Sequence, residues 1–494
     1  MNPAPVRLDI LRLPLLGRLL KQKRGRLYFQ IPLLLVALLL LYDGFTGPQQ
    51  ASQNLATVGV WVHYRGVLIL ILLLVGNLFC MGCPFTLPRT VARRLSKQGR
   101  RFPKALRGKW LAFAGLFGIF FLYEWLDLWA SPLLTAWVIL AYFGVSFALE
   151  LIFTESAFCK YVCPLGTFNF VYSTVSPLQI STRSPDVCRT CVGKECLNGS
   201  YAPSPLILTD LIREGASPST HEHNPQGVLG CGTLLFVPQI RSNFECTLCL
   251  DCARACPHDN VALQVRSPAK ELLDPQSFPR RWDVSFLFIA LAFMGVTNAF
   301  GMIPPVYDLI GALSRLTGIN AEWALLLILF GVGNVLLPAL VGVGMAWAVL
   351  RVTGTVLRGR RLRNVFCAFA PAFILVGIGI WAAHYGFHFV TGALTIVPVF
   401  QNFLQDHQIG LLGPPNWALG GLMGTAQFGL IQGMLIVGGY GLSLFTVRHT
   451  AADLFGQKGW RAWLVVSLIL LGLVLAALYV NAQPMEMRGI SDLH

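Results

Sequence analysis

The sequence predicts a polytopic α-helical membrane protein with a cysteine-rich insert between two groups of membrane helices. Of its 494 residues, 55% are hydrophobic and only 12% are charged, a balance that a water-soluble domain with a polar surface does not reach. The apolar residues form about nine stretches of roughly 20 residues, the length that a helix needs to cross the hydrocarbon layer of a bilayer. Most of the 13 cysteines lie in tight clusters, which is typical of metal ligation and not of isolated core thiols.

The order of apolar and polar stretches predicts three domains. Two groups of helices, four in residues 1–158 and five in residues 283–494, flank a polar stretch, 159–282, that is too long for a loop and has eight cysteines within 188–256. Ser131-Pro132, between the third and fourth helices, predicts a tight hairpin. The nine helices are expected near residues 28–45, 65–82, 110–130, 132–155, 283–304, 323–350, 365–390, 418–445 and 463–482.

Basic residues determine the expected orientation. If the N-terminus is cytoplasmic, 35 of the 38 Lys and Arg residues fall in segments on the cytoplasmic side, and only Arg65, Arg315 and Arg488 remain for the other side. This distribution predicts a multi-pass protein of a bacterial or archaeal cytoplasmic (inner) membrane, with the N-terminus and the insert inside and the C-terminus outside. Topology and contact with membrane lipid thus explain the net charge of +15, and nucleic-acid binding is not expected.

The strongest motif lies near the end of the insert. The residues Cys246-Thr-Leu-Cys249-Leu-Asp-Cys252-Ala-Arg-Ala-Cys256-Pro257 follow the C-x2-C-x2-C-x3-C-P pattern of bacterial ferredoxins. In that pattern three thiolates bind one [4Fe–4S] cluster and the fourth binds the other. A structural zinc site would use two separated cysteine pairs, and disulfides are not expected in a reducing cytoplasm. The motif therefore predicts iron–sulfur clusters.

A second cysteine triple precedes this motif, with one spacing stretched to four residues, and a single further cysteine lies between the two. By the crossing-over of two-cluster ferredoxins, the triple is expected to share its cluster with the last cysteine of the motif. The first cluster set is then Cys188, Cys191, Cys196 and Cys256, and the second cluster set is Cys231, Cys246, Cys249 and Cys252. The alternative is that the first triple is degenerate and Cys231 is a buried thiol, which leaves one cluster.

Four further cysteines form two pairs at predicted helix ends. Cys80 and Cys83 end the second expected helix, and Cys159 and Cys163 end the fourth, both at the cytoplasmic face. Each pair is followed by proline, which breaks the helix and leaves backbone N–H groups free to donate to sulfur. These four residues, the cysteine quartet, predict a third metal centre, with a cluster favoured over mononuclear iron or zinc. The alternative is packing of small apolar side chains at helix ends.

These motifs resemble those of the polyferredoxin-like [4Fe–4S] membrane proteins of the NapH, NosR and CcoG type. The resemblance covers Cys80–Pro84, Cys159–Leu165 and residues 188–265. It implies that helices with Cys-Pro endings precede a cytoplasmic two-cluster ferredoxin segment, and that the chain serves quinol-linked electron supply or the maturation of respiratory enzymes. The chain departs from the family in the two-residue spacing of its first cysteine pair, in its stretched first triple and in the five expected helices after the insert.

Ionisable side chains in the predicted membrane helices mark another candidate site. His384 and His388 lie four residues apart on the seventh expected helix, so both imidazoles share a face suited to a metal ion or a quinone head group. His63, Glu124 and Asp127 lie at the outer ends of the second and third helices and are expected to complete a proton-linked quinol pocket. The alternatives are an interfacial aromatic belt for the two helix-seven histidines and water-exposed helix ends for the other three residues.

The predicted cofactors indicate electron transfer. The sequence contains no Walker motif, dinucleotide-binding glycine pattern or Cys-x-x-Cys-His haem motif. The chain is expected to be an electron-transfer component of an oxidoreductase complex, which links the quinone pool or a partner redox subunit to another redox protein. Two alternatives remain. One is a reductase or maturation factor of the CcoG kind for a metalloenzyme, and the other is a transporter whose clusters sense redox state.

Overall fold

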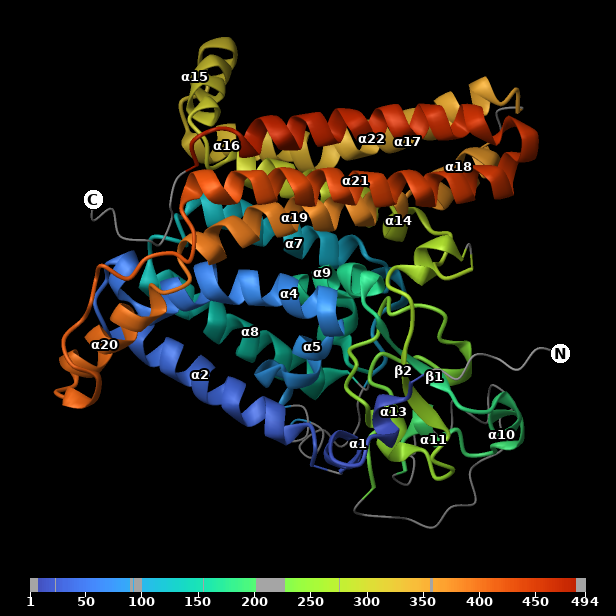
Figure 1. Ribbon diagram of the computed structural model, residues 1–494, viewed down its shortest axis with the longest axis horizontal. Helices are drawn as coiled ribbons and strands as arrows, with labels where there is room; N and C mark the ends of the chain where they lie inside the picture. Colours follow the sequence, from blue (N-terminus) through green and yellow to red (C-terminus); the bar gives the residue numbers. More distant parts are fainter. Residues whose placement is uncertain are drawn as a thin grey trace. The chain divides into compact units, whose positions relative to one another are not determined.

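The computed structural model describes residues 8–22, 24–88, 92, 100–153, 155–200, 227–274, 276–355 and 359–485. The chain forms two compact units, each assembled from three separate stretches of sequence. The first unit comprises Met1–Val36, Ile71–Arg107 and Tyr142–Glu271, and the second comprises Ala37–Leu70, Gly108–Ala141 and Leu272–His494. All cysteines of the predicted centres belong to the first unit. The helices and strands are drawn in Figure 1.

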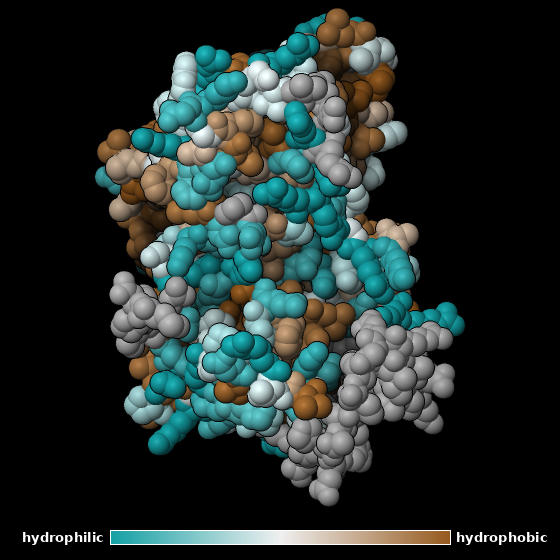
Figure 2. Space-filling view, turned by 90° about the vertical axis from the view of Figure 1, so that its right-hand side faces the viewer, coloured by the Kyte–Doolittle hydropathy of each residue, from teal (hydrophilic) through white to brown (hydrophobic). Residues whose placement is uncertain are grey.

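Seven helical stretches in the described ranges are long and apolar enough to cross a membrane. The chain is therefore a multi-pass helical membrane protein, as predicted. These stretches expose large apolar side chains such as Leu35, Leu74, Leu340 and Leu430, whereas hydrophilic side chains predominate on the face shown in Figure 2. The seven stretches are Leu27–Thr46, Leu55–Val75, Pro132–Ile152, Trp282–Phe300, Glu322–Val352, Arg361–Thr391 and Thr425–Asn481.

The observed stretches overlap eight of the nine expected helices. Thr425–Asn481 contains two of them, because it consists of α21 (Thr425–Phe455) and α22 (Gly459–Asn481), which pack against each other. The third expected helix, 110–130, is shorter, since α7 (Trp110–Trp125) ends before a turn in which Asp127 has a φ of 44°. Its 16 residues span about 24 Å at about 1.5 Å per residue, less than the roughly 30 Å of the hydrocarbon layer. The total of nine crossings stays a prediction.

The expected bounds of the second membrane helix, 65–82, are wrong at both ends. The helix begins at Leu55 and continues through α3 (Leu55–Thr57), the π-helical η3 (Val58–Tyr64) and α4 (Arg65–Val75). It stops because Gly76 has a φ of 74°, and a Cβ at Gly76 would lie 2.5 Å from Ser176 Oγ. Cys80 therefore lies on a separate short helix, α5 (Leu78–Gly82), and Cys83 is the C-cap of that helix.

The fourth membrane helix, like the second, ends before the cysteine pair that follows it. The other helices of the front half are α2 (Leu27–Thr46) and α7. The fourth membrane helix, α8 (Pro132–Ile152), is followed by a turn in which the Ser156 N–H donates to the Gly232 carbonyl at 3.0 Å. Cys159 lies in the π-helical η6 (Phe158–Val162), and Cys163 separates η6 from α9 (Pro164–Tyr172). The prediction that both cysteine pairs end membrane helices is thus corrected, since both pairs lie on short helices beyond the spans.

The rear half is organised around α19, whose side chains are almost all buried. Glycines allow close packing of α19 against α21, because a Cβ at Gly379 would lie 2.6 Å from the Leu435 carbonyl oxygen. Ser443 Oγ on α21 donates to the Ala372 carbonyl at 2.7 Å. Besides α21 and α22, this half contains α14 (Trp282–Phe300), α15 (Pro305–Thr317), α16 (Glu322–Gly331), α17 (Leu337–Val352), α18 (Gly359–Phe369), α19 (Ala372–Thr391) and α20 (Ile396–Asp406).

The described part of the insert is built on a small antiparallel sheet. β1 (Leu178–Thr182) pairs with β2 (Val261–Val265), with Ile180 opposite Leu263. Three short helices carry cysteines between the strands: α10 (Pro185–Thr190), α11 (Glu195–Asn198) and α13 (Asp251–Ala255). Because Thr182 pairs with Val261, the motif after β1 and the motif before β2 lie at the same end of the sheet.

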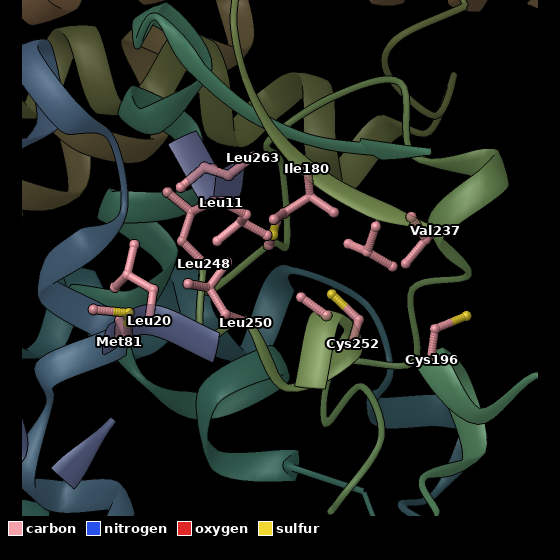
Figure 3. Close-up of a cluster of buried hydrophobic side chains, with 13 residues drawn as sticks. Leu11, Leu20, Met81, Ile180, Cys196, Val237, Leu248, Leu250, Cys252 and Leu263 are labelled. Atoms are coloured by element: carbon pink, nitrogen blue, oxygen red, sulfur yellow. The ribbon is translucent and has the colours of Figure 1, made fainter. Parts of the chain in front are cut away.

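The N-terminal segment packs against the insert. Asp9 forms a bridge to β2 at Gln264, and its carboxylate accepts a hydrogen bond from Arg183 Nε at 2.9 Å. Leu11 and Leu20, from η1 (Ile10–Arg12) and α1 (Leu16–Lys21), are buried with residues of both strands and of the cysteine loops. Figure 3 shows this core, with Cys196 and Cys252 at one end of it. Residues 8–22 are therefore part of the first unit.

Candidate metal centres

The four cysteines of the first cluster set surround one pocket. Cys188 lies on α10 and Cys191 is the C-cap of that helix, while Cys196 lies on α11. Cys256, the C-cap of α13, reaches the same pocket from the second motif. About 350 Å³ of space, part of it open solvent, lies among the residues that line the pocket. The structure thus brings together the three thiols of one motif and the fourth thiol of the other, the arrangement that crossing-over requires.

The cysteines of the second cluster set also lie close together. Burial raises the pKa of Cys252 far above its usual range, and the neighbouring thiolates of Cys249, Cys231 and Cys246 raise it further. Burial likewise raises the pKa of Cys249 to about 11. Such thiols lose their protons readily only when a cation binds to them, because the cation replaces the lost hydration and separates the negative charges. Cys231, the outlying cysteine of the sequence, therefore has the neighbours of a ligand.

Backbone and side-chain N–H groups point at the sulfur atoms of both sets. Asn260 Nδ2 donates to Cys188 Sγ at 3.2 Å, and the Asn260 backbone N–H donates to Cys256 Sγ at 3.4 Å. In the second set the Leu235 N–H donates to Cys231 Sγ at 3.3 Å. Hydrogen bonds to sulfur stabilise thiolates and tune the reduction potentials of iron–sulfur clusters. The sequence analysis did not predict a role for Asn260, although its position four residues after Cys256 could have indicated a donor to the cluster cysteines.

The backbone of the cysteine loops adopts left-handed conformations at residues that do not favour them. In the described ranges, nine residues other than glycine have positive φ, and five of these lie beside cluster cysteines. Alternation of right- and left-handed residues turns successive N–H groups toward one point, which forms the concave anion sites found around phosphate groups and iron–sulfur clusters. The five residues are Lys194, Leu234, Glu245, Leu248 and Leu250.

The thiols of the quartet, one buried and three partly buried, act on one another electrostatically although the two pairs lie far apart in the sequence. Burial raises the pKa of Cys159 far above its usual range. The negative charge of Glu150 raises this pKa further, and the charges of the other three cysteines raise it to a smaller extent. Burial raises the pKa of Cys80 to about 11 and that of Cys83 to about 12. The charges of the four thiols thus act on one another, and a common metal centre at the quartet stays a prediction.

Both Cys-Pro endings of the quartet direct N–H groups at sulfur. The Gly166 N–H donates to Cys163 Sγ at 3.1 Å, and the N–H groups of Phe85 and Thr86 lower the pKa of Cys83 against the effect of burial. Asn169 Nδ2 lies 3.4 Å from Cys80 Sγ as a further donor. Apolar packing does not require such donors, whereas thiolate ligands do.

In the ranges that the structure describes, no three His, Cys, Asp or Glu side chains gather closely enough to hold one metal ion. The binding of metal by the three groups of cysteines therefore stays a prediction.

Several side chains join the quartet to the second cluster set. Asn77 Nδ2, between α4 and α5, donates to the Cys246 carbonyl at 2.9 Å. Arg26 Nε donates to the Met81 carbonyl at 2.9 Å, and Arg26 Nη1 lies 3.7 Å from Asp251 Oδ2. The sequence indicated Arg26 only as one of many basic residues on the cytoplasmic side, so its place between two cysteine groups was not predicted.

The histidines of α19 share a buried face. The rings of His384 and His388 have centroids 5.0 Å apart and are nearly perpendicular, as their four-residue spacing predicts. His63 is held by backbone carbonyls, with Nδ1 3.1 Å from the Val58 oxygen and Nε2 3.1 Å from the Ala393 oxygen. Because a backbone carbonyl lies beside each ring nitrogen, His63 anchors the backbone and offers no open nitrogen to a ligand.

The two acidic residues of the predicted quinol pocket differ in burial. Glu124 is buried near the end of α7. Asp127 is exposed in the turn after α7 and accepts a hydrogen bond from Trp129 Nε1 at 3.2 Å. The position of Asp127 agrees with the alternative of a water-exposed helix end. The structure therefore supports a buried histidine pair, without assembling all five predicted residues into one site.

Arg65, which the sequence placed outside the membrane, lies within the second span and is buried. Its guanidinium carbon is 4.5 Å from the Trp61 ring, 4.3 Å from the Tyr123 ring and 5.1 Å from the Tyr385 ring. Aromatic faces attract a cation and so offset part of the cost of burying it. The expectation was wrong because the helix begins at Leu55, ten residues before its expected start.

No family model, no curated protein and no solved structure matches this chain.

Proposed function

We propose that the chain is a membrane electron-transfer protein that binds two [4Fe–4S] clusters through the first and second cluster sets and a third iron–sulfur centre through the quartet. One observation carries this proposal: the seven cysteines of two motifs, with Cys231 from between them, lie in two groups of four, and Cys256 joins the group of the other motif. Burial and the thiolates of Cys256, Cys188 and Cys191 together raise the pKa of Cys196 to about 12, which supports the same grouping.

The contacts between the groups support an order for electron movement. Bound clusters would supply one-electron chemistry, and the protein would supply their spacing and electrostatics. The quartet and the second set are joined by the hydrogen bond from Asn77 to the Cys246 carbonyl, and Cys196 of the first set acts on Cys252 of the second. The order quartet, second set, first set follows from these contacts. A quinol or a partner redox subunit would exchange electrons at one end, and another redox protein at the other.

The test is metal analysis combined with electron paramagnetic resonance (EPR). Anaerobically purified protein should contain about twelve iron and about twelve sulfide per chain if all three centres are clusters, or about eight of each if the quartet binds none. Zinc in place of iron would refute the proposal. Cys256→Ala should remove the signal of the first cluster and Cys231→Ala that of the second. Cys367→Ala is the matched control, since Cys367 lies on α18, away from all three groups in the sequence. Two intact signals in either test variant would refute the ligand assignment.

A further inference from the structure

Arg26 lies between the quartet and the second cluster set. Arg26 Nε donates to the Met81 carbonyl at 2.9 Å and Arg26 Nη2 donates to Thr86 Oγ1 at 2.7 Å, so two contacts bind the loop that holds Cys83. Arg26 Nη1 lies 3.7 Å from Asp251 Oδ2, in the loop of the second set. Only 16% of the Arg26 side chain is exposed. The guanidinium therefore bridges two cysteine loops that lie about 170 residues apart, like the Asn77 contact beside it.

The charges around Arg26 come from both groups. Burial on its own lowers the pKa of Arg26, yet the pKa is raised, because nearby anionic groups outweigh burial. Asp251 contributes most, followed by Cys249 of the second set and then by two cysteines of the quartet, Cys159 and Cys83. Asp251 also pairs with Arg254 at 2.8 Å, so it has a second cation of its own. Since arginine stays protonated in proteins, Arg26 is a fixed positive charge shared by the two cysteine groups.

We propose that Arg26 is a positioning residue that holds the quartet loop against the second cluster loop and raises the reduction potentials of both centres. This inference rests on the proposed function. Each centre gains one electron on reduction without binding a proton, so its negative charge grows by one. A fixed cation beside it favours the reduced form, and its removal lowers the potential. The first cluster set serves as an internal reference, because its cysteines are not among the groups that act on Arg26.

The experiment is a redox titration of the purified full chain, followed by EPR of each centre. Arg26→Gln should shift the midpoint potentials of the quartet species and the second cluster to lower values, and shift the first cluster less. Arg26→Lys keeps the charge but loses the forked hydrogen bonds, and should restore most of both potentials. Arg24→Gln is the matched control, since it removes an exposed charge two residues away and should leave all potentials unchanged.

The outcomes separate the two proposals. Wild-type protein without iron, or without a quartet species, overturns the proposed function itself. A loaded Arg26→Gln variant with unshifted potentials, or with shifts no larger than those of Arg24→Gln, overturns only the role of Arg26. If Arg26→Gln fails to assemble the quartet centre, Arg26→Lys decides. An assembled centre with potentials near wild type supports the role of the charge, and potentials well below wild type, or no assembly, would overturn it.

Discussion

Asn260 offers the sharpest test of the first cluster set. Its Nδ2 donates to Cys188 Sγ at 3.2 Å and to the Ser184 carbonyl at 2.7 Å, and its Oδ1 accepts from the Ser184 N–H at 2.9 Å. Asn260→Ala removes all three bonds but keeps the backbone N–H that faces Cys256. A hydrogen bond to a charged group contributes about 1.5–3 kcal/mol and a neutral one about 1 kcal/mol. Because water can replace part of the Ser184 contacts, the loss is about 3 kcal/mol, or roughly a hundredfold in the equilibrium for holding the cluster.

The assay is the release of iron to a chelator, followed together with the EPR amplitude of the first cluster. Asn260→Ala should release that cluster first and lower its potential, because an N–H donor no longer faces the thiolate. Asn260→Asp keeps an acceptor for the Ser184 N–H but directs a carboxylate at Cys188, so its effect should exceed that of Ala. Asn198→Ala is the matched control, since Asn198 Nδ2 donates to the Gly193 carbonyl at 3.0 Å and not to sulfur.

Two results would refute this reasoning. Iron release from Asn260→Ala at the wild-type rate would mean that the sulfur contact contributes nothing. An Asp variant milder than the Ala variant, with an unchanged potential, would mean that Asn260 only holds the Ser184 turn.

Three further predictions concern the quartet, the histidine pair and the topology. Cys83→Ala and Cys163→Ala should remove the same EPR species, and the double variant should cost little more than either, because ligands of one centre act as a unit; additive effects would contradict a shared centre. His384→Ala and His388→Ala should slow quinol-dependent cluster reduction in stopped-flow absorbance without altering cluster spectra, and unchanged rates would return both histidines to packing. A reporter enzyme fused after Arg315 should read external; a cytoplasmic reading would contradict the orientation.

The membrane helices were predictable because each depends on a local property, a run of apolar residues long enough to cross the bilayer. Their ends were not, because tertiary contacts determine them. Gly76 stops the second span through a left-handed conformation that fits against Ser176, a residue 100 positions away. The second span can include the charged side chain of Arg65 because three aromatic rings surround its guanidinium. Ser176, Tyr123 and Tyr385 all lie far outside a window of 20 residues around these positions.

The cysteines of the candidate centres were predictable because ligand spacing along the chain reflects the geometry of a cluster. The residues around them were not, because they come from distant segments. Arg26 contacts Asp251 from the start of the first membrane helix, and Asn169 reaches Cys80 across 89 positions. In a single sequence, nothing distinguishes these side chains from other arginines and asparagines.

The backbone of the Cys-Pro motifs bears on whether the quartet is a metal centre or packing. Cys83, Cys163 and Cys256 each end a short helix with φ between −60° and −71° and ψ between 114° and 120°, the extended conformation that a following proline favours. After each proline, N–H groups face the preceding sulfur, from Gly166 for Cys163 and from Asn260 for Cys256. Cys256 belongs to a ferredoxin motif, where these donors have a known purpose. Because the quartet repeats the same local arrangement, its backbone favours the proposed ligation over packing of small side chains.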